Sequence, residues 1–147
     1  MTCYLVDTNV VSAGAPGRQA HTPAVLHWME ANAASLFVSV VTVAEIQAGI
    51  AKARREGARR KASLLADWLD TVLHLYGDRI LPIDVAISRQ AGELSDFARG
   101  CGEAPGFADI AIAATARVRG LILLTRNLRH FRPLGIDARD PFSDVLV

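Results

Sequence analysis

Four short apolar runs recur along the chain, and longer stretches with helical spacing of their apolar residues separate them. We expect strands at residues 3–6, 36–41, 79–83 and 121–124. Because these runs are continuous rather than alternating, they are typical of strands that are covered on both faces, as in parallel sheets. Strands that alternate with helices over the whole length predict a three-layer α/β/α domain with a central, mainly parallel sheet of four to five strands.

The expected helices have recognisable beginnings. Thr22 followed by Pro23 is typical of an N-cap with proline at the first helical position, and Asp84 is placed to cap a later helix. After the second apolar run, Thr42 and Glu45 have the spacing of a capping box. We therefore expect that helix to begin at Thr42.

Composition limits the class of protein. The 147 residues, 51% of them apolar, can bury the core of a single domain over residues 1–147. The longest uncharged run lies between Glu30 and Glu45 and is shorter than the roughly 20 residues that cross a bilayer. The N-terminus does not have the pattern of a signal peptide, so we expect a cytoplasmic protein without a membrane partner. The mean hydropathy of +0.24 predicts that another subunit or protein covers part of the surface.

Three acidic side chains stand where a strand gives way to a helix or where a helix begins: Asp7, Glu45 and Asp109. Each also has a purely structural interpretation, as a turn cap, a member of the capping box, and a favourable charge at a helix start, respectively. Strand-to-helix junctions of a parallel sheet share its carboxyl edge, where α/β proteins bind ligands. The three carboxylates are therefore expected to converge there, with the amide of Asn127 beside them.

Converging carboxylates raise each other's pKa unless a cation compensates their charge. Oxygen-only ligands favour Mg²⁺ or Mn²⁺ over zinc. A divalent ion held in this way can activate a water molecule and neutralise charge on a phosphoryl group, which suits phosphodiester hydrolysis. The sequence contains no serine nucleophile elbow, P-loop or Gly-x-Gly-x-x-Gly pattern that would favour another chemistry.

Six of the 16 basic residues fall within the segment Lys52–Lys61. One interpretation is the solvated end of a helix, where cations suit the negative end of the dipole. The other is a contact with a phosphate backbone, shared with the Arg-rich segment 126–132. In that case, reversing Arg54 and Arg55 to Glu should weaken RNA binding and flatten its salt dependence. We interpret His130 as a solvated loop residue.

Four segments, taken together and in this order, resemble the motifs of PIN-domain proteins, in particular the VapC-type toxins of bacterial toxin–antitoxin pairs, including their FitB-like branch. The segments are Leu5-Val6-Asp7-Thr8-Asn9-Val10-Val11, Val40-Val41-Thr42-Val43-Ala44-Glu45-Ile46, Ala108-Asp109-Ile110-Ala111-Ile112-Ala113-Ala114-Thr115-Ala116 and Leu124-Thr125-Arg126-Asn127. The resemblance spans nearly the whole chain, and its specificity lies in the set rather than in any one segment.

This resemblance implies a dimeric, Mg²⁺- or Mn²⁺-dependent ribonuclease that a cognate VapB-type antitoxin holds inactive by covering the active site with its C-terminal segment. Carried over by position, Asp7, Glu45 and Asp109 are the acidic residues of the metal site. Asn127 stands where many relatives have a fourth acid, although Asn is also common there. His130 stands where relatives often have Asp, so it receives no acidic role.

The resemblance further implies that Thr8, Asn9 and Thr125 support the site by hydrogen bonds. In the resulting hypothesis, Asp7 and Asp109 hold the metal, and Glu45 holds the metal or orients water. The amide of Asn127, at the position of the fourth acid of many relatives, polarises the edge of the site.

Two other function classes stay open at this stage. A haloacid-dehalogenase-like phosphatase would use Asp7 as a covalent nucleophile, but such proteins usually carry a second Asp at the position of Asn9. A catalytically inactive module would bind RNA or a partner without cleavage under every metal condition.

Overall fold

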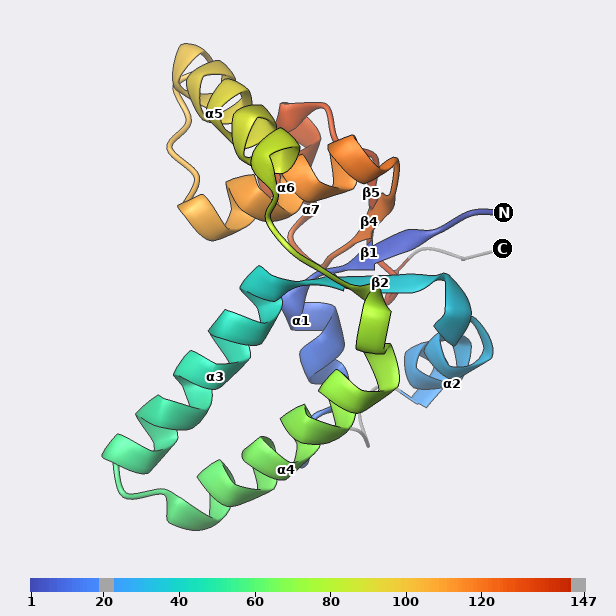
Figure 1. Cartoon of the computed structure of the whole chain (residues 1–147), viewed down its shortest axis with the longest axis vertical. Helices are drawn as coiled ribbons and strands as arrows, with labels where there is room; N and C mark the ends of the chain where they lie inside the picture. Colours follow the sequence, from blue (N-terminus) through green and yellow to red (C-terminus); the bar gives the residue numbers. More distant parts are fainter. Residues whose placement is uncertain (19–22, 144–147) are drawn as a thin grey trace.

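A sheet lies between two helical layers in the computed structural model, which describes residues 1–18 and 23–143 (Figure 1). Within these ranges five strands form: β1 (Tyr4–Val6), β2 (Leu36–Ser39), β3 (Ile80–Leu81), β4 (Ile122–Leu124) and β5 (Ala138–Arg139). Their order is β3-β2-β1-β4-β5, and each neighbouring pair is parallel. The predicted three-layer α/β/α domain with a parallel sheet is confirmed.

Helices connect the strands and cover both faces of the sheet. The longer ones are α2 (Pro23–Ala31), α3 (Val40–Arg55), α4 (Arg59–Tyr76), α5 (Val85–Gly100) and α6 (Phe107–Arg119). The short helices, with η for a 3-10 helix, are α1 (Thr8–Val11), η1 (Ser12–Gly14), η3 (Ala33–Ser35), η4 (Gly77–Arg79), α7 (Leu128–Phe131) and η5 (Arg132–Leu134). Among the described residues, no helix is both long and apolar enough to cross a membrane.

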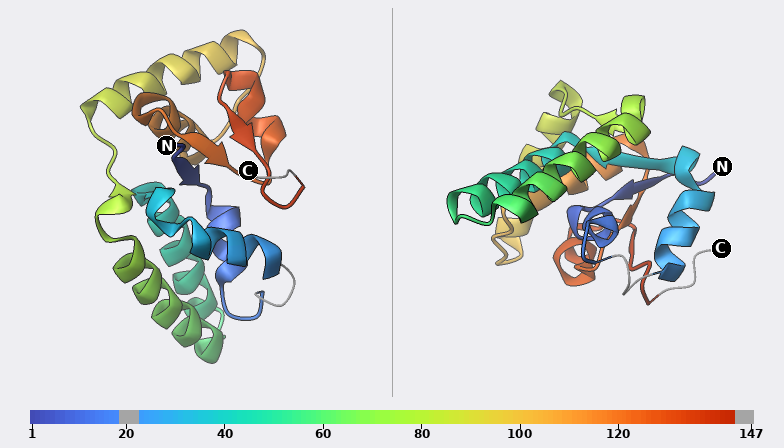
Figure 2. Two further views of the ribbon diagram at one scale, coloured as in Figure 1. Left: turned by 90° about the vertical axis from the view of Figure 1, so that its right-hand side faces the viewer. Right: turned by 90° about the horizontal axis from the view of Figure 1, so that it is seen from below.

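The central strand β1 faces two separate cores. Tyr4 and Val6 pack with side chains of α3 and α4, whereas Leu5 packs with those of α5 and α6. Successive side chains of a strand point to opposite faces, so a strand that is apolar at every position needs a core on each side. Figure 2 shows the strands between the α3–α4 pair and the α5–α6 pair.

The chain changes direction across the sheet at β1. It adds β2 and β3 on one side and then returns to place β4 and β5 on the other. In sheets of this kind, ligands bind at the carboxyl ends of the strands where the order switches. Asp7 directly follows β1 and Thr125 directly follows β4, and the Asp7 N–H donates to the Leu124 carbonyl at 2.9 Å. The two side chains are therefore neighbours at this switch point.

Two of the predicted helix beginnings are found. The Asp84 side chain accepts a hydrogen bond from the Ile87 N–H at 2.9 Å and so caps α5, as predicted. Helix α2 begins at Pro23, as predicted, whereas Thr22, its expected cap, lies outside the described residues.

The second strand begins where it was predicted, but its predicted end and the predicted capping box are wrong. Strand β2 ends at Ser39, whose hydroxyl accepts the Val41 N–H at 3.0 Å and starts α3 at Val40. A side-chain oxygen that reaches an exposed N–H stabilises the first turn of a helix, and here it outweighs the strand preference of two valines. Thr42 therefore lies inside the first turn rather than at its cap, and Glu45 does not cap the helix.

Candidate functional site

Asp7 is the buried centre of the site. Only 4% of the residue is exposed, although it carries an ionisable group. The Thr8 N–H donates to Asp7 Oδ1 at 2.8 Å, and the Thr125 hydroxyl donates to Oδ2 at 2.7 Å. Its structural interpretation as a cap is thus correct for α1. The same two bonds fix the orientation of the carboxylate at the carboxyl edge of the sheet.

The pKa of Asp7 is affected by the charges of the other two carboxylates. Burial raises the pKa of Asp7 above its ordinary value, the hydrogen bonds from Thr125 and Thr8 lower it, and the charges of Asp109 and Glu45 raise it further. The net direction is upward because burial disfavours the ionised form. Asp109 and Glu45 are therefore both near enough to Asp7 for their charges to act on it.

Glu45 is held by a threonine pair rather than by its own helix. The Thr8 hydroxyl donates to Glu45 Oε1 at 2.6 Å, and the hydroxyl oxygens of Thr8 and Thr42 are 2.9 Å apart. Because Thr8 has a single hydroxyl proton, Thr42 is the donor in the second bond. Glu45 itself is exposed, so this chain of hydroxyls aims a solvated carboxylate at the site.

Asp109 has an unforeseen partner. It lies in the first turn of α6, with 28% of its side chain exposed, and its Oδ2 is 3.2 Å from His130 Nδ1. His130 is exposed, as predicted, but it belongs to the short helix α7 after β4 rather than to a loop. Its position shortly after the fourth apolar run was the available signal, since that run also ends at the carboxyl edge.

The two asparagines tie the ends of β1 and β4 together. Asn9 Oδ1 accepts the Arg126 N–H at 3.2 Å, and the Asn127 N–H donates to the Thr125 hydroxyl at 3.0 Å. Each of Thr8, Asn9 and Thr125 therefore makes a hydrogen bond of the supporting kind that the resemblance implies. The Asn127 backbone orients the hydroxyl that holds Asp7.

The donor chemistry of the site fits a hard divalent cation. All three acidic residues offer carboxylate oxygens, and the buried charge on Asp7 has no neighbouring cation in direct contact among the described side chains. In the described part of the chain, no three His, Cys, Asp or Glu side chains form a ready-made metal cluster. Glu45 and Asp109 are instead engaged by Thr8 and His130.

A long groove reaches the site from the side of Glu45. It has a volume of about 1050 Å³ and lies between the segment after η1 and the hairpin formed by α3 and α4. We call it the basic groove; its lining includes Thr8, Glu45, Arg18, Lys52, Arg59, Arg60, Lys61, Ile46, Leu64, Leu65 and Trp68. A smaller cavity of about 290 Å³ adjoins Asp109 and His130 on the other side. The carboxylates thus lie between two openings.

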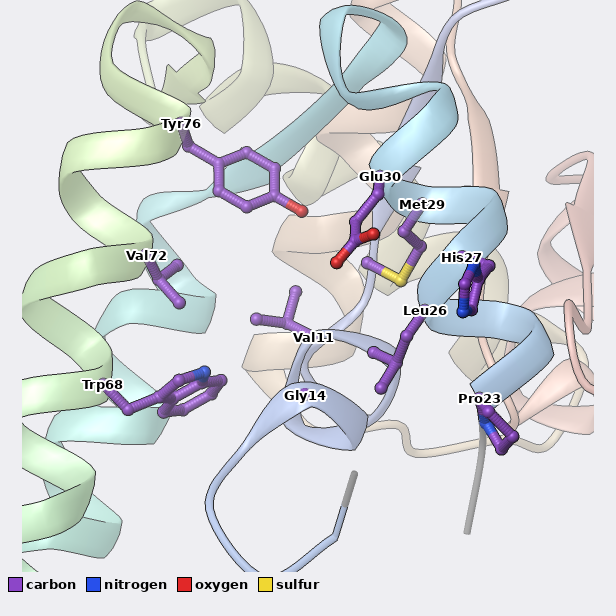
Figure 3. Close-up of a pocket in the computed structure, with 10 residues that line it drawn as sticks. All are labelled: Val11, Gly14, Pro23, Leu26, His27, Met29, Glu30, Trp68, Val72 and Tyr76. Atoms are coloured by element: carbon purple, nitrogen blue, oxygen red, sulfur yellow. The ribbon is translucent and has the colours of Figure 1, made fainter. Parts of the chain in front are cut away.

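A further cavity of about 410 Å³ lies between α2 and α4, away from the carboxylates (Figure 3). Tyr76 and Glu30 point into it from the two helices, and burial raises the pKa of Tyr76 to about 12. None of the four predicted site residues, all of which the structure describes, lines this cavity. It shares Trp68 with the basic groove.

Comparisons with known proteins agree with this architecture. The sequence model of the PIN domain matches residues 4–135. The chain is 36% identical to the VapC ribonuclease Y4jK of Sinorhizobium fredii, over 95% of this chain and 97% of that protein. It is 30% identical to the toxin FitB of Neisseria gonorrhoeae, over 95% of this chain and 99% of that protein.

A solved structure gives the same result. The crystal structure of FitAcB from Neisseria gonorrhoeae superposes with a TM-score of 0.82 and 29% identity, covering 95% of this chain and 99% of that chain. The chain belongs to the PIN-domain family.

Proposed function

We propose that this PIN-domain protein is the toxin of a type II toxin–antitoxin system and acts as a metal-dependent endoribonuclease on RNA phosphodiester bonds. The observation that carries the proposal is the convergence of Asp7, Glu45 and Asp109 from three separate elements on one edge of the sheet. Relatives named VapC ribonuclease and toxin FitB support it. We further propose that residues 1–147 form one nuclease domain that works in the cytoplasm.

The chain's own residues would divide the work at the site. Asp7 and Asp109 would hold Mg²⁺ or Mn²⁺, and Glu45 would join them or orient the attacking water. Bound there, the ion would neutralise charge on the phosphoryl group and lower the pKa of water. Thr125 and the Thr8 N–H keep Asp7 aimed at the site. The amide of Asn127, at the position of the fourth acid of many relatives, would polarise the edge of the site.

RNA cleavage by the purified chain tests the proposal. We expect cleavage with Mg²⁺ or Mn²⁺, and loss of cleavage with EDTA or with Asp7→Asn, which keeps the size of the side chain. Asp67→Asn, a change on the exposed surface of α4, is the matched control and should cleave normally. Cleavage that survives both EDTA and Asp7→Asn would refute the proposal.

The two alternatives predict different products. A phosphatase would leave a phosphoenzyme trapped on Asp7, whereas the amide of Asn9, at the position of the second Asp, is engaged by the Arg126 N–H. An inactive module would bind RNA and leave it intact with every divalent ion. Trapping of the phosphoenzyme, or binding without cleavage, would replace the ribonuclease with one of these.

The proposed partners are a cognate VapB-type antitoxin and a second copy of the chain. Expression of the chain should arrest growth, and a small open reading frame beside its gene should relieve the arrest. Size-exclusion chromatography with light scattering should show a homodimer. A well-behaved monomer would contradict the dimer, and arrest that no neighbouring gene relieves would contradict the antitoxin.

A further inference from the structure

The basic groove joins the proposed catalytic site to the end of the α3–α4 hairpin. Thr8 and Glu45 line it where α3 begins near the sheet, and Lys52, Arg59 and Arg60 line it toward the turn between the helices. From Glu45 to Lys52 the helix advances about 10 Å at 1.5 Å per residue. Figure 1 shows that this hairpin projects away from the sheet. The groove is therefore an extended path that ends at a carboxylate.

The two walls of the groove differ in character. Ile46, Leu65 and Trp68 give it an apolar side, together with Leu64, which is 45% exposed despite its size. An exposed leucine beside a half-buried indole offers a surface against which a flat apolar group can pack.

The rim of the groove is cationic. Arg18, Lys52, Arg59, Arg60 and Lys61 line it, against the single acid Glu45 at its inner end. Lys52 has an exposed partner in Glu56 at 3.9 Å, a weak ion pair. With the other described residues, none of the remaining four cations forms an ion pair. Their charge is thus available to an anionic ligand.

The dipole interpretation of the basic segment explains only half of it. Lys52, Arg54 and Arg55 occupy the last turn of α3, where cations are favourable. Arg59, Arg60 and Lys61 occupy the first turn of α4, at the positive end of its dipole, and that turn contains no acid. The second half of the segment is therefore placed against the helix dipole. All three of its cations line the groove, whereas Lys52 is the one cation of the first half that does.

We propose that single-stranded RNA reaches the carboxylates along the basic groove, with bases against Leu64, Leu65 and Trp68 and phosphates along Arg18, Arg59, Arg60 and Lys61. This proposal rests on the ribonuclease function proposed above. An unpaired strand combines a regular row of phosphates with exposed flat bases, so it matches both walls at once. A purely acidic protein segment would match the rim but would make no use of the apolar wall.

The test measures binding in EDTA, so that it does not depend on cleavage. The probe is a fluorescein-labelled, unstructured RNA of about 15 nucleotides, within the range of single-strand sites. Arg59→Gln/Arg60→Gln should weaken binding by about tenfold in about 0.1 M salt and flatten the salt slope by about 1.4, or about 0.7 per lost phosphate contact. The matched control is Arg54→Gln/Arg55→Gln, which removes the same charge from the same hairpin. The sequence alone suggested this pair for phosphate contact, but the structure places both residues outside the groove lining, so binding should stay nearly unchanged.

A second measurement, the fluorescence of Trp68, tests whether RNA contacts the apolar side of the groove. Trp28→Phe keeps a ring against Tyr4 and leaves Trp68 as the one remaining tryptophan of the sequence. RNA should quench its fluorescence, with the same midpoint as the binding curve.

Equal weakening by the two double variants, or no weakening by Arg59→Gln/Arg60→Gln, would overturn the groove as the RNA path. So would binding of oligoglutamate in place of RNA, which would assign the groove to an acidic protein segment. A chain that binds RNA in this way but never cleaves it would instead overturn the proposed function alone.

Discussion

Helices α3 and α6 each bring a carboxylate to the site near their first turn, yet they are embedded very differently. Helix α6 is buried over seven consecutive residues, Ile110–Ala116, whereas α3 buries a single stripe of Thr42, Ile46, Ile50 and Ala53. Asp109 is therefore positioned by a helix that the core surrounds. Glu45 belongs to a projecting hairpin and depends on hydroxyls of Thr8 and Thr42 for its aim.

The difference separates two tasks that the fold combines at one edge. The α5–α6 side supplies a rigid wall, because a helix packed on every side cannot shift without disturbing the core. The α3–α4 side supplies exposed surface, where charges can change with little effect on stability. Substitutions on the α5–α6 side and on the α3–α4 side should therefore have different effects on activity, stability and pH dependence.

The largest effect is expected on RNA cleavage when the carboxylates of Asp109 and Glu45 are replaced one at a time. Asp109→Asn should lower RNA cleavage by at least about a hundredfold, since even an outer partner of a metal ligand costs 10- to 100-fold. Glu45→Gln should cost less if Glu45 orients water and equally if it holds the metal. Single-turnover rates across a Mg²⁺ titration separate the two. The exposed Asp96→Asn on α5 serves as the control, and full activity of Asp109→Asn would remove it from the site.

The next effect compares the burial of the two helices. Ala113→Leu adds volume to a fully buried position of α6 and should destabilise the fold by about 1–3 kcal/mol. At about 2–4 °C per kcal/mol for a chain of this size, the melting temperature falls by several degrees. Ala48→Leu makes the same change on the exposed side of α3 and should leave the melting temperature nearly unchanged. Equal losses would show that both helices are packed alike.

The sequence predicted the layers because each layer follows from a local pattern. A strand such as Tyr4–Val6, apolar at every position, needs helices on both faces, and both are present. The convergence of Asp7, Glu45 and Asp109 followed from the shared carboxyl edge of parallel strands. These arguments need only the type and order of the elements.

Contacts between elements were less predictable, since they depend on which side chain reaches which. The capping box at Thr42 failed because Ser39 caps the helix first, and this released Glu45 to pair with Thr8, 37 residues away. The bond between Asp109 and His130 depends on the orientation of α7, which no periodic pattern encodes. Long-range polar pairs of this kind require the assembled sheet edge.

A smaller effect compares the hydroxyls on the two sides. Thr125→Val removes the donor to buried Asp7 and the acceptor of the Asn127 N–H, so we expect a loss of about 1.5 kcal/mol in urea unfolding. Thr8→Val removes the donor to Glu45, whose exposed carboxylate is then hydrated. It is combined with Thr42→Val, because the buried Thr42 hydroxyl would otherwise lose its acceptor, and the loss should be clearly smaller. Thr125→Ser keeps the hydroxyl and should retain most of the stability. Equal losses for the two valine variants would contradict the difference in burial.

The smallest expected effect is on the pH dependence of the free energy of unfolding of the metal-free protein. The folded pKa of Asp7 lies above its ordinary value of 3.8, so the ionised form is disfavoured in the native state. The stability that neutral Asp7 contributes is present below pH 3.8 and is lost as the pH rises through the folded pKa. Asp7→Asn cannot ionise, so its stability relative to the wild type should increase over that window.

Urea unfolding of both proteins in EDTA, from about pH 4 to pH 7, measures this difference and cancels the titration of groups that do not interact with Asp7. Excess Mg²⁺ at neutral pH should reverse its sign, because an ion that binds only the folded wild type stabilises it by mass action. The exposed Asp67→Asn should show neither trend. If the difference in unfolding free energy between the two proteins is constant with pH, burial does not raise the pKa of Asp7. If Mg²⁺ still stabilises Asp7→Asn, the ion is held mainly by Asp109 and Glu45. The metal ligands would then come from α6 and α3 rather than from the residue that follows β1.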